Sequence, residues 1–180
     1  MPADADDGYV HLEHTIDPVF DERCTLLVLG SFPSARSREA RFFYGNPRNR
    51  FWRVLATLFG QPVPPDEPVC VSTDAKRRLL HDCHVALWDV VASCDIRGSS
   101  DASIRDVVPT DLSRILGSCP IEAVFGNGGT ATRLYRRYQE QVTGRPITGL
   151  PSTSPANASY SLERLVQVWS CALRRWLPGG

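Results

Sequence analysis

The chain has 180 residues, 42% of them hydrophobic, and its 20 Lys and Arg residues balance 20 Asp and Glu residues. A chain of this length can bury the core of one domain without disulfides or metal ions to hold it together. Zero net charge excludes the general polycationic binding typical of histone tails, although a local basic patch is compatible with it. We expect a single domain over residues 1–180, with residues 1–14 forming a loosely ordered N-terminal extension.

The sequence carries no signal for a membrane segment. No apolar run approaches the ~18 residues that a membrane helix needs, and the N-terminus is acidic, unlike a secretory signal peptide. We therefore expect a soluble, monomeric protein of the cytoplasm with no membrane partner. The six cysteines form no C-x-x-C pair, which favours buried free thiols without a metal ion. Convergence of four of them on an iron–sulfur cluster is the alternative.

Short apolar stretches alternate with amphipathic ones along the chain, and the apolar stretches have the length and branched residues of buried strands. The predicted strands are residues 25–29, 85–88 and 121–125. The helical spacing of apolar residues predicts three helices, at residues 51–59, 131–142 and 162–176. Four prolines make residues 61–68 a surface loop. Strands alternating with helices predict an α/β fold, a three-layer α/β/α sandwich around a mostly parallel central sheet.

Two loops lie where such a sheet binds ligands, beyond the carboxyl ends of its strands. Residues 30–34 (Gly-Ser-Phe-Pro-Ser) follow the first strand, and residues 149–159 precede the last helix. Both loops combine small hydroxyl residues with proline, which presents O–H and backbone N–H groups on a stiff frame. Residues 152–154 fit a turn that grips phosphate and, equally, an entry loop that binds nothing.

The neutral total hides a basic segment, because residues 35–53 contain six arginines against the single Glu39. Aromatic residues are interleaved with these arginines, as recognition of unpaired bases requires: a ring stacks on a base while arginine neutralises phosphate. Phe51 and Trp52 fit better as the core face of the following helix. This core interpretation is weaker for the aromatic residues 42–44, which precede Pro47 in a loop.

Asn49 has two competing interpretations. It stands at the N-cap position of the helix that begins near Phe51, and asparagine is among the best N-caps. An amide whose oxygen accepts an N–H of that helix cannot also orient a water. Asn46 is either a hydrogen-bonding loop residue or a pocket residue. The aspartates at 89, 95 and 101 could include a general base, although Asp101 fits a helix cap as readily.

Five stretches in order resemble the uracil-DNA glycosylase superfamily, and within it the hypoxanthine (deoxyinosine) DNA glycosylase-like branch. Together they cover roughly residues 15–176. The stretches are residues 29–34, 44–52, 86–91 with Cys94, 127–128 and 150–157. Each stretch is weak alone, and their order across one α/β domain makes the resemblance specific.

The resemblance implies a monofunctional DNA N-glycosylase that needs no metal and no cofactor. Its partner would be DNA containing deaminated bases, from which it would flip one base and hydrolyse the N-glycosidic bond. Hypoxanthine is the favoured base, and a uracil-specific glycosylase of the same superfamily is the alternative. A nucleic-acid or nucleotide binding module without chemistry is the second alternative. A bacterial-type, nucleoid-associated location in the cytoplasm would follow.

The resemblance also implies roles for individual residues. Asn49 matches the catalytic amide. The residues that match the base pocket are Gly30, Ser31, Phe32, Pro33, Tyr44, Asn46 and Asn127, with Tyr44 in the base-stacking position. The residues that match the DNA-binding positions are Ser34, Arg48, Arg50, Leu150, Pro151, Ser152, Thr153, Ser154 and Asn157. Phe32 replaces the Asn or Asp of sister branches, Asn46 stands where relatives often have His, and Thr110 stands where we expect Asn.

Overall fold

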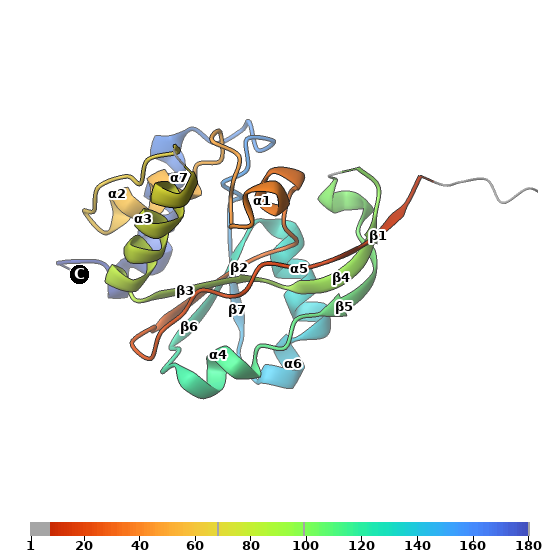
Figure 1. Cartoon of the computed structure of the whole chain (residues 1–180). Helices are drawn as coiled ribbons and strands as arrows, with labels where there is room; N and C mark the ends of the chain where they lie inside the picture. Colours follow the sequence, from red (N-terminus) through yellow and green to blue (C-terminus); the bar gives the residue numbers. More distant parts are fainter. Residues whose placement is uncertain (1–7, 68, 99, 180) are drawn as a thin grey trace, which may run out of the picture.

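The computed structural model describes residues 8–67, 69–98 and 100–179, and a parallel four-stranded sheet lies at its centre (Figure 1). The strand order is β3–β2–β6–β7, and every neighbouring pair is parallel. The strands are β2 (Leu26–Gly30), β3 (Val85–Asp89), β6 (Ala123–Asn127) and β7 (Ile147–Leu150). The three predicted strands are confirmed with shifts of one or two residues, whereas β7 was not predicted.

Helices cover both faces of this sheet, so the predicted three-layer α/β/α sandwich is confirmed (Figure 1). Alternate residues of β2 point to opposite faces, with Leu26 and Val28 in one core and Leu27 and Leu29 in the other. The first core is covered by α2 (Phe51–Leu58), α3 (Val69–Asp82) and α7 (Leu162–Leu173). The second is covered by α4 (Ser113–Ser118) and α5 (Gly129–Tyr138), which α6 (Glu140–Thr143) follows.

A second, antiparallel sheet of three strands has the order β1–β4–β5. Its strands are β1 (Val10–Glu13), β4 (Val91–Ile96) and β5 (Arg105–Pro109). The expectation of a loosely ordered extension over residues 1–14 is therefore wrong for residues 10–13, and residues 1–7 lie outside the described part. Backbone hydrogen bonds to β4 hold β1 in place. The acidic composition of the N-terminal segment gave no sign of this pairing, because the hydrogen bonds do not involve its side chains.

Shorter elements complete the chain. Helix α1 (Ala35–Ala40) follows the first loop, η1 (Asp101–Ser103) joins β4 to β5, and η2 (Arg174–Trp176) ends the last helix. The helix expected over residues 131–142 is divided into α5 and α6, because the backbone at Gln139 leaves the helical region. Residues 61–67 contain neither helix nor strand, as their prolines predicted.

Trp169 provides a test of the packing between α7 and α2. Its side chain is fully buried, its ring lies 6.1 Å from the ring of Phe51, and its Nε1–H donates to the carbonyl of Pro151. Replacing it with alanine should lower the free energy of unfolding by about 3–5 kcal/mol, as measured by urea denaturation. The control Val142→Ala, at a side chain 85% exposed, should change it by less than about 0.5 kcal/mol. A loss below about 1 kcal/mol for Trp169→Ala would contradict this packing.

Candidate functional site

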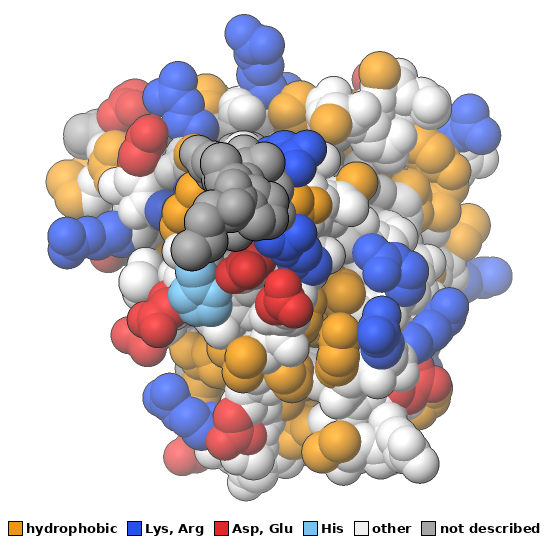
Figure 2. Space-filling view, turned by 90° about the vertical axis from the view of Figure 1, so that its right-hand side faces the viewer, with side chains coloured by type: hydrophobic (Ala, Val, Ile, Leu, Met, Phe, Trp, Pro, Cys, Tyr) orange, Lys and Arg blue, Asp and Glu red, His pale blue; other side chains and the backbone are white. Residues whose placement is uncertain are grey.

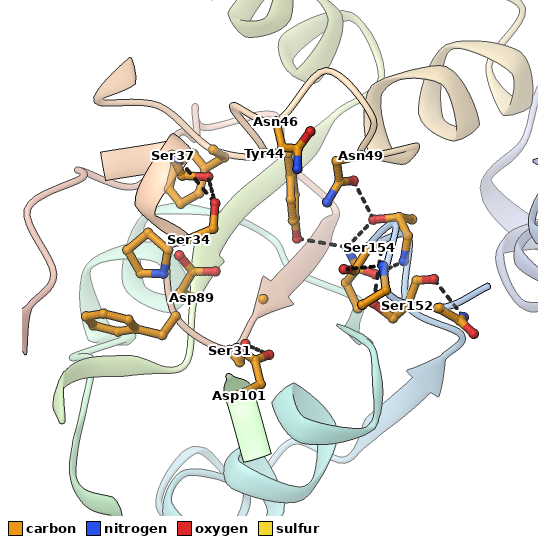
Figure 3. Close-up of a pocket in the computed structure, with 18 of the residues that line it drawn as sticks. Ser31, Ser34, Ser37, Tyr44, Asn46, Asn49, Asp89, Asp101, Ser152 and Ser154 are labelled. Atoms are coloured by element: carbon orange, nitrogen blue, oxygen red, sulfur yellow. Dashed lines mark hydrogen bonds between the residues drawn. The ribbon is translucent and has the colours of Figure 1, made fainter. Parts of the chain in front are cut away.

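A cavity of about 470 Å³ lies beyond the carboxyl ends of the parallel strands (Figure 3). This volume is within the ~300–1,000 Å³ typical of ligand pockets. Its walls come from the loop after β2, the segment before α2, the end of β3, η1, the end of β6 and the loop after β7. A parallel sheet gathers these segments because the carboxyl ends of its strands meet at one edge.

The cavity brings together all the residues predicted for the base pocket, along with Asn49. The predicted pocket residues that line it are Gly30, Ser31, Phe32, Pro33, Tyr44, Asn46 and Asn127. Five residues predicted to contact DNA line it too: Ser34, Ser152, Thr153, Ser154 and Asn157. The roles of these residues stay predictions, and their convergence from distant parts of the sequence is a finding.

A chain of hydrogen bonds centred on Thr153 joins three of the lining segments. The Asn127 amide nitrogen donates to the Thr153 hydroxyl at 2.9 Å, and the Asn127 oxygen accepts from the Thr153 backbone N–H at 3.0 Å. The Thr153 hydroxyl in turn donates to Asn49 Oδ1 at 2.9 Å. Thr153 is fully buried, whereas the two amide side chains are half-buried at the cavity wall. The network fixes the positions of three segments relative to one another: the end of β6, the loop after β7 and the segment before α2.

The Asn49 side chain is oriented by these contacts. Its Oδ1 accepts from the Phe51 backbone N–H at 2.9 Å and from the Thr153 hydroxyl, so both oxygen lone pairs are used. Its Nδ2 has no hydrogen-bond partner among the described residues, and in Figure 3 it lies on the side of Tyr44. Arg50, not Asn49 as predicted, is the N-cap residue of α2, but Asn49 still caps the first N–H of the helix from one position earlier. With its oxygen used in this way, Asn49 offers the cavity a donor rather than an acceptor.

Tyr44 offers the cavity a second donor. Its backbone is left-handed (φ 52°), its ring packs 4.4 Å from that of Phe51, and its hydroxyl accepts from Asn127 at 2.9 Å. Burial, and less strongly the negative charge of Asp89, raise the pKa of Tyr44 well above its usual value. The hydroxyl therefore keeps its proton, and this proton is left to donate because Asn127 already occupies the oxygen as a donor. Stacking of Tyr44 on a base stays a prediction.

Arg50 holds the loop that precedes α7. Its guanidinium donates to four backbone carbonyls, those of Thr153, Ser154, Asn157 and Tyr160. Four of the five N–H donors of Arg50 are thus committed within the protein, and its direct contact with DNA stays a prediction. Arg48 is exposed next to the cavity-lining Asn49 and remains available for the predicted contact.

Burial corrects several other predicted contacts. Leu150 is 4% exposed and belongs to the core as the last residue of β7, so it cannot reach DNA as predicted. Thr153 is equally inaccessible and serves as the buried link described above. Pro151 is partly buried and does not line the cavity. Phe42 and Phe43 are both core residues, each 2% exposed, which excludes Phe42 as a stacking platform.

The loop around Ser152–Asn157 is shaped by its own side chains. The Ser152 hydroxyl accepts from the Ser154 N–H, the Ser154 hydroxyl accepts from the Ala156 N–H, and the Asn157 amide donates to the Ser152 carbonyl. Ser34 is exposed and caps α1 by accepting from the Ser37 N–H. The Ser34 hydroxyl is also bonded to the Ser37 hydroxyl at 3.1 Å, whereas the hydroxyl protons of Ser152 and Ser154 remain to be donated, as contact with phosphate oxygens requires.

Two carboxylates in the cavity, which the sequence offered as candidate general bases, were not among the residues that the resemblance assigned to the site. Asp89, at the end of β3, accepts a hydrogen bond from His14 at 2.8 Å. Asp101, at the start of η1, is bonded to the Ser31 hydroxyl at 2.5 Å. Burial, and the neighbouring charge of Asp89, raise the pKa of Asp101, whereas the Ser31 hydrogen bond lowers it. The strand end that carries Asp89 was the available sequence signal, and nothing in the sequence linked His14 to it.

The charges of the antiparallel-sheet side of the molecule are mixed. Figure 2 shows acidic and basic side chains interspersed on the side that carries β1, β4 and β5, without a continuous basic surface. In the described residues, no three His, Cys, Asp or Glu side chains gather as a metal site requires. Four of the six cysteines are buried free thiols, and Cys70 and Cys171 are exposed. Within the same described ranges, no helix has the length and apolar character needed to cross a membrane.

Residues 18–172 match the model of a protein family, the uracil DNA glycosylase superfamily. The chain belongs to this superfamily. The match spans every segment that lines the cavity, from the loop after β2 to the loop before α7.

Relatives and a solved structure agree with this assignment. A hypoxanthine DNA glycosylase of Methanosarcina acetivorans is 30% identical over 159 residues, which cover 87% of this chain and 94% of the relative. A second, from Methanosarcina barkeri, is 30% identical over 112 residues, covering 62% and 68%. A solution NMR structure of a proposed uracil DNA glycosylase from M. acetivorans superposes with a TM-score of 0.75 and 28% identity, covering 93% of this chain and 99% of that one. The superfamily resemblance stated from the sequence is confirmed.

The Thr153 hydroxyl is the testable centre of the hydrogen-bond network. Thr153→Val keeps the shape of the side chain but leaves Asn49 without one donor and Asn127 without one acceptor. We expect a loss of about 1–3 kcal/mol in the free energy of unfolding, because two half-buried amides lose the partner that the Thr153 hydroxyl provides. The control Thr153→Ser keeps the hydroxyl and should lose clearly less. Equal losses for the two variants in denaturant titrations would show that packing, not the hydroxyl, matters.

Proposed function

We propose that this protein is a DNA glycosylase that excises hypoxanthine from DNA, leaving an abasic site. The observation that carries the proposal is the cavity, whose inner wall holds two donors, Asn49 Nδ2 and the Tyr44 hydroxyl, beside the carboxylate of Asp89. The 30% identity to two proteins named hypoxanthine DNA glycosylase supports the choice of base. The cavity has room for a base turned out of the helix, and extrusion costs least at a mismatched base.

The arrangement suits cleavage of an N-glycosidic bond. As the bond lengthens, electrons pass to the departing base and the sugar becomes oxocarbenium-like. Donors that are already oriented stabilise such a developing negative charge without reorganisation. The Asn49 amide and the Tyr44 hydroxyl meet this condition, because Thr153, Phe51 and Asn127 hold them in place.

Asn49 would act through its nitrogen. The amide oxygen is occupied by Phe51 and Thr153, so it cannot take a proton from a water molecule. The free N–H₂ group can donate to the departing base, or to the oxygen of the attacking water, and hold either in place. Capping and catalysis therefore use different atoms of the same side chain and do not exclude each other.

Parallel excision assays test the activity. Duplexes with I:T, I:C, U:G and U:A pairs are incubated with excess protein, and abasic sites are then cleaved with alkali. We expect hypoxanthine release from both inosine duplexes to exceed uracil release from both uracil duplexes. Faster uracil release on every pairing would establish the uracil-specific alternative. DNA binding without release of any base would establish a binding module.

Replacement of Asn49 separates its two functions. In Asn49→Asp the carboxylate can keep the Phe51 and Thr153 hydrogen bonds while an oxygen replaces the nitrogen that faces the cavity. We expect unchanged thermal stability and a loss of about 100-fold or more in single-turnover excision rate, as when a preorganised donor is removed.

The variant Asn49→Ala provides the comparison. It should lose excision to a similar extent and, in addition, about 1 kcal/mol of stability as the capping contact disappears. Excision by Asn49→Asp at the wild-type rate or faster would show that the cavity needs an acceptor at this position, and the donor role would be rejected.

Salt dependence tests the rim of the cavity. Each arginine that neutralises a phosphate contributes about 0.9 to the slope of log affinity against log salt. Arg48→Ala should therefore reduce the magnitude of the slope by about that amount for duplex DNA. Arg114 is exposed on α4, which leads to the opposite edge of the sheet, so Arg114→Ala should leave the slope unchanged. Equal slopes for wild type and Arg48→Ala would remove Arg48 from the DNA-binding surface.

A further inference from the structure

A buried histidine–aspartate pair forms part of the cavity wall and is not needed by the mechanism above. Asp89 is the last residue of β3, is 3% exposed and lines the cavity. Its Oδ2 accepts from His14 Nε2 at 2.8 Å, and both side chains are almost completely buried. The Thr110 hydroxyl donates to the Asp89 backbone carbonyl at 2.8 Å, which fixes the strand end. A charged residue at this depth is costly unless it has a function or a full set of partners.

His14 can act towards Asp89 only as a donor. Its Nδ1 accepts from the Ile16 backbone N–H at 3.2 Å, so the ring proton resides on Nε2, which faces Asp89. The ring is enclosed by Phe32, Phe43 and Trp88, whose centroids lie 6.0–6.3 Å from it. Aromatic packing and the backbone contact together fix both the tautomer and the orientation of the ring.

The second oxygen of Asp89 is left for the cavity. No hydrogen bond from the described residues ends on Oδ1. A methyl group added at Gly30 would collide with Asp89 Oδ1 and would lie 3.2 Å from the Tyr44 hydroxyl oxygen. The acceptor Asp89 Oδ1 and the donor hydroxyl of Tyr44 therefore lie close together, next to Gly30, which has no side chain to separate them. In Figure 3 Asp89 lies on the other side of Tyr44 from Asn49.

Deamination changes one ring atom in the same way in each base. N1 of adenine and N3 of cytosine are bare acceptors, whereas hypoxanthine and uracil carry N–H at these positions, next to a carbonyl. A carboxylate oxygen accepts such an N–H and repels a bare nitrogen lone pair. A hydroxyl beside it can donate to the adjacent carbonyl.

We propose that Asp89 is the specificity-determining residue of the cavity: its Oδ1 accepts the ring N–H that deamination creates, and His14 is the positioning residue that leaves this oxygen free. The proposal rests on the proposed glycosylase function. It extends that function by defining the substrate class as bases with a ring N–H beside a carbonyl. Adenine, which fills the same space as hypoxanthine, is rejected at this atom because its lone pair would face the carboxylate.

The substitution Asp89→Asn provides a sharp test because His14 dictates how the new amide lies. The N–H at His14 Nε2 needs an acceptor, and only the oxygen of the introduced amide can accept. This oxygen therefore takes the place of Oδ2, and the amide nitrogen faces the cavity. The group presented to the base thereby changes from acceptor to donor with little change in shape. The variant should favour a base that has a bare nitrogen in place of the N–H.

The experiment compares single-turnover release of hypoxanthine with release of unsubstituted purine from a duplex containing 2′-deoxynebularine, whose N1 is a bare acceptor. Wild type should release hypoxanthine faster, and Asp89→Asn should shift the ratio of the two rates towards purine by ~10- to 100-fold, the worth of one charge-assisted hydrogen bond. A merely structural role would lower both rates together and leave the ratio unchanged. A ratio within about threefold of the wild-type value would overturn the proposal, because the loss of a hydrogen bond to a charged group should change the ratio by more than this.

The chain offers a matched control and a second variant. His11 and Asp95 form a similar pair, 2.7 Å apart, on the exposed surface, so Asp95→Asn should leave the ratio unchanged. If melting temperatures show that Asp89→Asn does not fold, Asp89→Ala removes the acceptor and should move the ratio in the same direction, and an unchanged ratio overturns the proposal.

The outcomes also separate this proposal from the proposed function. Release of hypoxanthine by wild type with an unchanged ratio in the variants rejects the role of Asp89 alone. If wild type releases uracil instead, the same comparison is made with uracil and 2-pyrimidinone, whose N3 is a bare acceptor. Release of none of these bases would reject both proposals.

Discussion

The hydroxyl of Thr153 is the interaction on which the arrangement of the site depends. It is fully buried, it accepts from the amide at the end of β6 and it donates to the amide that precedes α2. Three segments that are far apart in the sequence meet at this one atom. Its contact with Asn49 uses the amide oxygen and leaves the amide nitrogen of Asn49 without a partner among the described residues, while Asn127, which donates to Thr153, also donates to the Tyr44 hydroxyl. Because the buried Thr153 hydroxyl bonds both amides within the protein, the geometry is set before any ligand enters.

The charges of the molecule are divided between the cavity and its rim. The buried carboxylate of Asp89 lines the inside, whereas Asp101, which also lines the cavity, and Arg48 beside it are exposed. Such a division suits a ligand with a neutral base and a charged backbone, because the base meets the acidic wall while phosphates stay outside. It does not suit a free nucleotide whose phosphates would enter the cavity. The zero net charge of the chain is compatible with DNA binding for the same reason.

Much of the fold followed from local patterns. The sequence shows β2, β3 and β6 as apolar runs, and α2 and α7 as apolar stripes at helical spacing. These elements could be predicted because the apolar side chains that bury each of them lie within the element itself. The antiparallel sheet was missed, because β1, β4 and β5 are half exposed and mixed in composition. Their pairing is decided by backbone hydrogen bonds between distant segments, which leave little trace in residue type.

The sequence predicted which residues lie at the site better than it predicted what each of them does there. The sequence by itself determined the three-layer fold, because strand and helix patterns are local features, and its resemblance to the superfamily identified most of the residues around the cavity. Only the tertiary structure decided which atom each residue presents. Asn49 offers its nitrogen, Arg50 is committed to carbonyls, and Leu150 is in the core. The His14–Asp89 pair joins residues 75 positions apart. A hydrogen bond fixes an orientation only when both partners are present, and long-range partners are brought together by folding alone.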